Sequence, residues 1–223
     1  MTGQLSFDLP AKPALGRDDF FVAPSNAMAV AMIDRPEHWP GGKLVLAGPS
    51  GSGKTHLTHV WAAQVGARII AARDLTEADV PELARGPIAV EDVPDIANRP
   101  APQTALFHLH NLLQSEGRRL LMTGQLAPNL WTMSLADLQS RIDAAPHVML
   151  DPPEDQLLAA ILAKLFSDRQ IVPKPDVIPY LVGHIDRSFE AAADAVERLD
   201  RAALAETRTL SRPLAVKLLS ETS

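Results

Sequence analysis

One segment of the sequence has the residue types and spacing of a loop that holds phosphate groups. The pattern GxxxxGK[ST] is matched directly after the apolar run Leu44–Ala47, by Gly48-Pro49-Ser50-Gly51-Ser52-Gly53-Lys54-Thr55. Its glycines let the backbone curl with its N–H groups inward, and the start of the following helix adds positive potential. Lys54 supplies a charge for the terminal phosphates, and Thr55 offers a hydroxyl to Mg²⁺. The alternative, a glycine-rich turn that binds nothing, is disfavoured by the strand before the loop and the helical spacing after it.

A second candidate for phosphate chemistry is a pair of acids at the end of an apolar run. Glu91 and Asp92 follow Ile88–Val90, which has the character of a buried strand. In phosphate-transferring enzymes with this kind of loop, an acid at a strand end holds Mg²⁺, and a second acid can orient the attacking water. We therefore assign Glu91 to the metal and Asp92 to the water. Alternatively, both acids only cap a strand where it meets solvent.

The elements that position these groups follow from the spacing of apolar residues. Short apolar runs, each separated from the next by helical spacing, predict strands at Leu44–Ala47, Arg68–Ala72, Ile88–Glu91, Leu120–Thr123 and Val148–Leu150. Strands that alternate with amphipathic helices form a parallel sheet with crossover helices. The sequence therefore predicts an α/β fold of the P-loop ATPase type, with five parallel strands and flanking helices.

The pattern changes after the last expected strand. Beyond Pro153 the strand signals stop, and helical spacing continues from an apolar stripe formed by Leu157, Leu158, Ile161, Leu162 and Leu165. We expect a small C-terminal helical lid over residues 153–223 and a nucleotide-binding α/β domain over residues 19–152. Residues 1–18, which include Pro10, Pro13 and Gly16, are expected to form a flexible tail.

Composition narrows the class of protein. The 223 residues carry a formal charge of −6, which argues against a protein whose affinity comes from neutralising the phosphates of duplex DNA. There is no cysteine, no pattern of a secretory signal and no apolar stretch of the length that spans a bilayer. We therefore expect a cytoplasmic protein without a membrane partner, which contacts DNA only indirectly.

The loop and its surroundings resemble the DnaA family of AAA+ replication initiators. Gly53-Lys54-Thr55-His56-Leu57 carries the resemblance, together with Phe20-Phe21-Val22 and Ser25-Asn26 upstream. The resemblance implies ADP or ATP as ligand, with Mg²⁺, and adds His56 to the loop signature. It also implies that Phe21 and Val22 cover the adenine while Asn26 contributes polar contacts. The alternative is a helix cap above core hydrophobes.

Three further positions extend the resemblance along the chain. Thr123 matches the residue that senses the terminal phosphate, although Gln125 stands where such families often have aspartate. Arg141 matches the arginine finger, which points out of its own subunit and accelerates hydrolysis in a neighbour. Arg187 matches the lid arginine that lies over the nucleotide. The alternatives are a surface pairing of Arg141 with a nearby acid such as Asp137, and plain solvent exposure for Arg187.

The first residues contain a candidate docking peptide. The segment resembles a motif that binds the sliding clamp, the beta subunit of DNA polymerase III, and reads Gln4-Leu5-Ser6-Phe7-Asp8-Leu9. The sequence also ends a few residues after the last expected lid helix, so we expect no helix-turn-helix reader like that of the initiator. These features resemble a regulatory member of the family, which implies DnaA and the clamp as partners. A tail without any binding role is the alternative interpretation.

Three interpretations of the function remain open. In the first, the chain hydrolyses nucleotide weakly and completes the active site of DnaA through Arg141, while Asp92, Thr123 and Arg187 serve its own nucleotide. In the second, it is an autonomous ATPase, a helicase loader or a DNA-remodelling factor. A scaffold that uses nucleotide only to hold its fold is a further possibility, and the sequence leaves self-association open.

Overall fold

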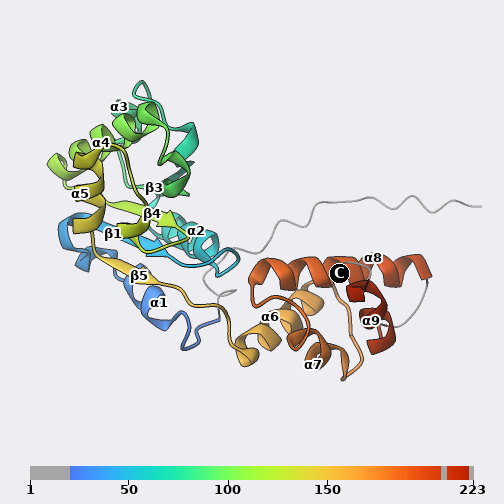
Figure 1. Cartoon of the computed structure of the whole chain (residues 1–223). Helices are drawn as coiled ribbons and strands as arrows, with labels where there is room; N and C mark the ends of the chain where they lie inside the picture. Colours follow the sequence, from blue (N-terminus) through green and yellow to red (C-terminus); the bar gives the residue numbers. More distant parts are fainter. Residues whose placement is uncertain (1–20, 207–209, 221–223) are drawn as a thin grey trace, which may run out of the picture.

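The computed structural model describes residues 21–206 and 210–220, so the peptide Gln4–Leu9 and Phe20 lie outside the described residues. The strands of one parallel sheet are β1 (Lys43–Ala47), β2 (Arg68–Ala71), β3 (Ile88–Glu91), β4 (Leu120–Gly124) and β5 (His147–Met149). Their order across the sheet is β2-β3-β4-β1-β5 (Figure 1). The expected α/β fold with five parallel strands is confirmed.

The central strands are apolar because both faces of the sheet are covered. Every residue of β1 and of β4 is buried, as expected for a parallel sheet between two helical layers. Leu44 and Leu46 contribute to the core on one face, and Val45 between them to the core on the other. The last strand begins one residue before the expected run, and the N–H of Leu150 still donates to the carbonyl of Ala47 at 2.7 Å.

Each face of the sheet has its own helices. The core on one face includes α1 (Ala27–Ile33) and α2 (Lys54–Val65), and the core on the other includes α3 (Val80–Leu83), α4 (Pro100–Ser115) and α5 (Ala136–Ala144). Short 3₁₀ turns connect these elements at η2 (Pro36–His38), η3 (Pro40–Gly42), η4 (Ala72–Asp74), η5 (Val93–Ile96) and η6 (Pro128–Leu130). The sheet is thus the middle layer of a three-layer arrangement.

The helices after β5 form a separate group, the helical lid. They are α6 (Asp155–Asp168), α7 (Val177–Val182), α8 (Phe189–Glu206) and α9 (Arg212–Ser220), and they lie to one side of the sheet in Figure 1. Phe166, Leu181 and Val196 belong to an apolar core that this group builds for itself. The lid that the apolar stripe predicts is therefore present. Within the described ranges, no helix is long and apolar enough to cross a bilayer.

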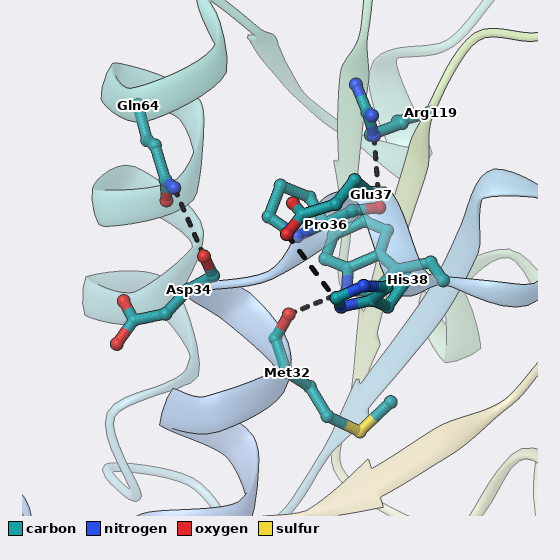
Figure 2. A network of polar contacts seen from close by, with 8 residues as sticks. Met32, Asp34, Pro36, Glu37, His38, Gln64 and Arg119 are labelled. Carbon is teal, nitrogen blue, oxygen red and sulfur yellow. Dashed lines mark hydrogen bonds and ion pairs between the residues drawn. The ribbon is translucent and has the colours of Figure 1, made fainter.

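Backbone carbonyls fix the segment between α1 and β1 to the rest of the α/β layer (Figure 2). The indole N–H of Trp39 donates to the carbonyl of Met32 at 2.7 Å, and the guanidinium of Arg119 donates to that of Pro36 at 3.0 Å. The Trp39 ring also stacks on Trp61 of α2, with centroids 5.2 Å apart. These contacts anchor α1, whose amino end follows the segment expected on the adenine side.

Candidate nucleotide-binding site

The phosphate-binding motif forms the connection between β1 and α2. Residues 48–53 follow the end of β1, and α2 begins at Lys54 with Gly53 as its N-cap. Gly51 and Gly53 have φ angles of 68° and 98°, which residues with a side chain rarely adopt. The glycines therefore allow the loop to turn sharply, so that α2 can begin directly after it.

Lys54 lies within the curl of this loop. Its ammonium donates to the carbonyls of Gly48 and Pro49, at 2.7 Å in each case, and its side chain is buried. Burial lowers the pKa of Lys54, while the nearby carboxylates of Asp92 and Glu91 act in the opposite direction. A cation held at this place is available to the terminal phosphates of a nucleotide.

Thr55 and Glu91 lie together, as expected for a metal-binding pair. The Thr55 side chain lies close enough to the Glu91 carboxyl group to lower its pKa. Burial raises the pKa of Glu91, as does the charge of Asp92, whereas Thr55, His59 and Lys54 lower it. The Oε1 atom of Glu91 is buried and has no hydrogen-bond partner among the residues that the structure describes. Mg²⁺ prefers oxygen ligands, and this pair offers the Thr55 hydroxyl and the Oε1 atom of Glu91.

Asp92 and Thr123 are joined by a hydrogen bond between neighbouring strand ends. The backbone N–H of Asp92 donates to Oγ1 of Thr123 at 3.1 Å. Asp92 has φ 55° and ψ 47°, a left-handed conformation that aspartate tolerates better than most residues. This turn directs the chain away from β3 immediately after Glu91. The structure therefore brings the two acids, Thr123 and the loop to the same edge of the sheet.

The loop and Asp92 line an open cleft of about 430 Å³, within the size range of ligand sites. The cleft is bordered by Ser50, Gly51, Gly53, Lys54, Thr55, Asp92, Asp95, Gln125, Phe189 and Glu190. Asp95, Phe189 and Glu190 were not expected from the sequence. The two lid residues reach the cleft because α8 begins beside the phosphate loop, which no local pattern in the sequence reveals.

Direct contacts join the lid to the loop. The backbone N–H of Phe189 donates to the carbonyl of Gly51 at 2.7 Å. Ser188 caps α8 by accepting a hydrogen bond from the N–H of Ala191 at 3.0 Å. Arg187, next to it, forms an ion pair with Asp155 at 2.5 Å and donates to the carbonyl of Pro153. Its guanidinium is thus held at the amino end of α6, and its contact with a nucleotide stays a prediction.

On the adenine side, Asn26 forms hydrogen bonds with the neighbouring backbone, and its contact with a nucleotide stays a prediction. Its Oδ1 accepts from the N–H of Ala23 and its Nδ2 donates to the carbonyl of Phe21, both at 2.9 Å. The buried carboxamide thus holds the preceding backbone in place. The side chains of Phe21 and Val22 are exposed, which suits the cover of a base, but that contact remains a prediction. His56 lies in the first turn of α2.

Arg141 lies away from the cleft of its own chain. It is an exposed residue near the end of α5, just before β5, and its charge acts on Lys43 at the start of β1 and on His110 of α4. The start of β1 is the edge of the sheet opposite the phosphate loop. Among the described residues, Arg141 forms no ion pair, so the alternative pairing with Asp137 is not observed.

The charge of Arg141 acts on two buried side chains, a lysine and a histidine. Lys43 is 6% exposed and donates to Oε1 of Gln114 at 2.8 Å. Burial lowers its pKa, and Arg141 lowers it further. His110 is 2% exposed, and burial followed by the charge of Lys43 lowers its pKa to about 4. His110 is therefore neutral at pH 7, and the charge of Lys43 has the same sign as that of Arg141.

The fold and this arrangement of loop, strand-end acids and helical lid match the AAA+ P-loop ATPase fold. Among solved structures, domain III of the replication initiation protein DnaA from Thermotoga maritima has a TM-score of 0.83 and 21% identity, covering 96% of this chain and 98% of its own. AMPPCP-bound DnaA from Aquifex aeolicus has a TM-score of 0.69 and 20% identity, over 85% of this chain and 66% of that chain.

The comparison also includes a more distant protein of the same fold. A point mutant of RuvB from Thermotoga maritima has a TM-score of 0.68 and 15% identity, over 86% of this chain and 66% of that one. The chain thus spans about two thirds of these longer neighbours, at 66% for both DnaA from Aquifex aeolicus and RuvB. No family model matches the sequence. The chain therefore has a DnaA-like AAA+ fold.

Proposed function

We propose that this chain is an adenine-nucleotide-binding regulator of replication initiation that resembles Hda, the regulatory inactivator of DnaA. It binds ADP or ATP with Mg²⁺, docks on the sliding clamp through Gln4–Leu9, and stimulates ATP hydrolysis by DnaA. Its contact with DNA is indirect, through the clamp, and it acts in the cytoplasm. The observation that supports this most is the exposed Arg141, which lies opposite the chain's own phosphate loop and has no acid partner among the described residues.

Nucleotide binding is supported by the chemistry of the cleft. Inward backbone N–H groups and the buried Lys54 would hold the phosphates, and the DnaA neighbour with AMPPCP has the same fold. Thr55 and Glu91 would hold Mg²⁺, which neutralises charge on phosphate oxygens when it is bound. Phe21 and Val22 would cover the base, while Asn26 keeps their backbone in position.

Weak hydrolysis by the chain itself follows from the groups around the cleft. Asp92 would orient water, but Glu91 is one methylene longer than the usual aspartate, and Gln125 replaces an expected acid. Arg187 is held by Asp155, so bringing it over the nucleotide requires that this ion pair opens. The nucleotide then serves to organise the protein, with little turnover.

Stimulation of a partner follows from the position of Arg141. A guanidinium inserted beside the terminal phosphate of a neighbouring protein stabilises the charge of the transition state, by about 10³- to 10⁵-fold in rate. Among the described residues Arg141 forms no ion pair, and its charge acts on Lys43 and the neutral His110, neither of which is an acid. Its charge is therefore available to the phosphates of DnaA-bound ATP.

The deciding experiment follows hydrolysis by DnaA in the presence of clamp-loaded DNA and this chain. We expect conversion of DnaA-ATP to DnaA-ADP, and we expect Arg141→Ala to abolish the stimulation while ADP binding stays intact. Arg85→Ala is a matched control, because Arg85 is also an exposed arginine and pairs with Glu82 outside the site. Full stimulation by the Arg141→Ala protein would refute the proposal.

The clamp contact has its own test. Gln4→Ala combined with Leu5→Ala should remove binding to the isolated clamp, measured by surface plasmon resonance. Ser6→Ala is the control, because the apolar and amide side chains of the motif carry the expected contacts. Unchanged affinity of the double variant would exclude this peptide as the docking element.

The second candidate is an autonomous AAA+ ATPase that acts as a helicase loader or a DNA-remodelling factor. The presence of both acids beside Lys54, at one edge of the sheet, favours it. Rapid ATP turnover by the purified chain, without DnaA or clamp, would support this candidate over a regulator. The same measurement across protein concentrations would reveal whether copies of the chain stimulate one another as a homo-oligomer.

A further inference from the structure

A buried amide in α4, that of Gln103, connects the turn beside the nucleotide cleft with the start of the helix that carries Arg141. Gln103 is 0% exposed. Its Nε2 donates to the carbonyls of Ile96 and Ala97, both at 2.7 Å. Its Oε1 accepts from Oγ of Ser134 at 3.0 Å and from the N–H of Leu135 at 2.8 Å. Two carbonyls on one side and two donors on the other fix the orientation of the amide.

The partners of Gln103 belong to the cleft on one side and to the Arg141 helix on the other. Ile96 is the last residue of η5, the turn that starts directly after Asp92 and contains the cleft residue Asp95. Leu135 is the N-cap of α5, the helix of nine residues that carries Arg141. One side chain therefore holds both the turn after the acids and the first residue of that helix.

A second set of contacts fixes the stretch between β4 and α5 to the same turn. A Cβ atom added to Gly124 would lie 2.5 Å from the Trp131 ring and 2.8 Å from Pro94, so these groups are in tight contact. The indole of Trp131 donates to the carbonyl of Leu126 at 2.7 Å. Trp131 thus packs between the end of β4 and η5, a short distance along the chain from Leu135.

We infer that Gln103 is a positioning residue, which transmits the arrangement of the acidic end of the nucleotide cleft to the orientation of α5 and thereby of Arg141. This inference rests on the proposed function for its consequence, namely that bound nucleotide controls stimulation of DnaA. Its physical content is independent of any partner. A displacement of η5 when a bound metal engages Glu91, the residue before Asp92, moves the two carbonyls that Gln103 binds, and the same amide holds the start of α5.

Only an amide of this length meets both sets of partners. In Gln103→Glu, a carboxylate replaces two donors and sets an acceptor against the carbonyls of Ile96 and Ala97. The contacts with Ser134 and Leu135 can remain, so the helix keeps its attachment to the side chain while the turn loses it. Buried polar groups without partners are costly, which predicts a detachment of η5 in this variant.

The experiment uses the absence of cysteine from the chain. Ser140→Cys places a single thiol on the exposed residue before Arg141, for a nitroxide label read by electron paramagnetic resonance. With Gln103 present, ADP and Mg²⁺ should change the mobility of the label. In Gln103→Glu this change should disappear, while the dissociation constant of ADP, from calorimetry, changes by less than about threefold. Stimulation of DnaA should fall about tenfold, the usual scale of such coupling.

Two further variants separate positioning from stability. Leu113→Ala removes a buried side chain of α4 that Gln103 does not contact, so it should lower the melting temperature but keep the response of the label to ADP. Ser134→Ala, at an exposed position, removes one of the two donors to Oε1 and should weaken the response even if Gln103→Glu does not fold.

The outcomes distinguish this inference from the proposed function. If ADP binds but the label responds equally with Gln103 and in Gln103→Glu and Ser134→Ala, or does not respond at all, the positioning role is wrong while regulation of DnaA can stand. If the label responds as expected but DnaA is not stimulated, the positioning role stands and the proposed function fails.

Discussion

The N–H of Phe189 donates to the carbonyl of Gly51, so the first turn of lid helix α8 is hydrogen-bonded to the phosphate loop at 2.7 Å. Ser188 packs against the same glycine, because a Cβ atom on Gly51 would lie only 2.4 Å from its Cβ. The position of the lid therefore depends on the conformation of the loop. Phosphates that reorder the loop also act on α8, which brings Glu190 to the cleft.

Gly51→Ala should disturb this junction. Gly51 has φ 68° and no room for a methyl group, so the variant combines backbone strain with a clash against Ser188. We expect a loss of at least about 2 kcal/mol in the free energy of unfolding and a clear loss of ADP affinity. Gly66→Ala is the matched control, because Gly66 has φ 67° with nothing within 4 Å of the added Cβ. Equal ADP affinities of the two variants would contradict the role of the junction.

Lys54→Ala tests the cradle itself. Removing a charge that makes charge-assisted hydrogen bonds to phosphates should weaken ADP binding by about 100-fold in calorimetry. Lys174→Ala, at an exposed position in the lid region, should bind like the unmodified chain. If Lys54→Ala also retains full affinity, the loop does not bind phosphate in the way that its sequence indicates.

The metal-binding pair predicts a pH dependence of nucleotide binding. Burial raises the pKa of Glu91, so the carboxylate is lost at a higher pH than in an ordinary glutamate as the solution is acidified. Because metal ligands must be deprotonated, the gain in ATP affinity from Mg²⁺ should be large at pH 7.5 and diminish at pH 5. Glu91→Gln should remove the gain at both pH values. A constant gain in this variant would exclude Glu91 as a ligand.

His110 should make the fold sensitive to acid. Its pKa is about 4 in the folded chain and near 6.5 when unfolded, so the unfolded state binds the proton first as the pH falls. The free energy of unfolding is therefore unaffected by His110 above pH 6.5. It falls progressively as the pH is lowered towards 4, by about 3 kcal/mol in all. Denaturant titrations of His110→Gln should show a smaller loss over this range than the unmodified chain. His108→Gln, at an exposed position on the same helix, should not differ from it.

The sequence predicts much of the α/β layer because its signals are local. Residues 44–47 and 120–123 are buried throughout, so an apolar run was sufficient to locate these strands. The phosphate loop was likewise recognisable from spacing alone, and its geometry follows from glycines with positive φ. The end of β5 differs from the expected one, since Leu150 is buried and hydrogen-bonded without belonging to the strand.

The parts that could not be predicted depend on contacts between distant segments. Phe189 and Glu190 reach the cleft only because the lid packs beside the loop. The hydrogen bonds of the Asn26 side chain with the backbone of residues 21 and 23 likewise have no signal in the sequence. Gln103 gives no signal at all, because its partners come from two loops that only the fold brings to it.

The location of Arg141 at the edge of the sheet opposite the phosphate loop gives the molecule a polarity. Association that joins the guanidinium of one molecule to the phosphates of the next is head-to-tail, and such contacts do not saturate in a symmetric pair. However many molecules join, one Arg141 guanidinium and one nucleotide site remain unoccupied at the two ends of the row. A row of such molecules therefore grows in one sense until it closes on itself or meets a partner that offers only one of the two ends.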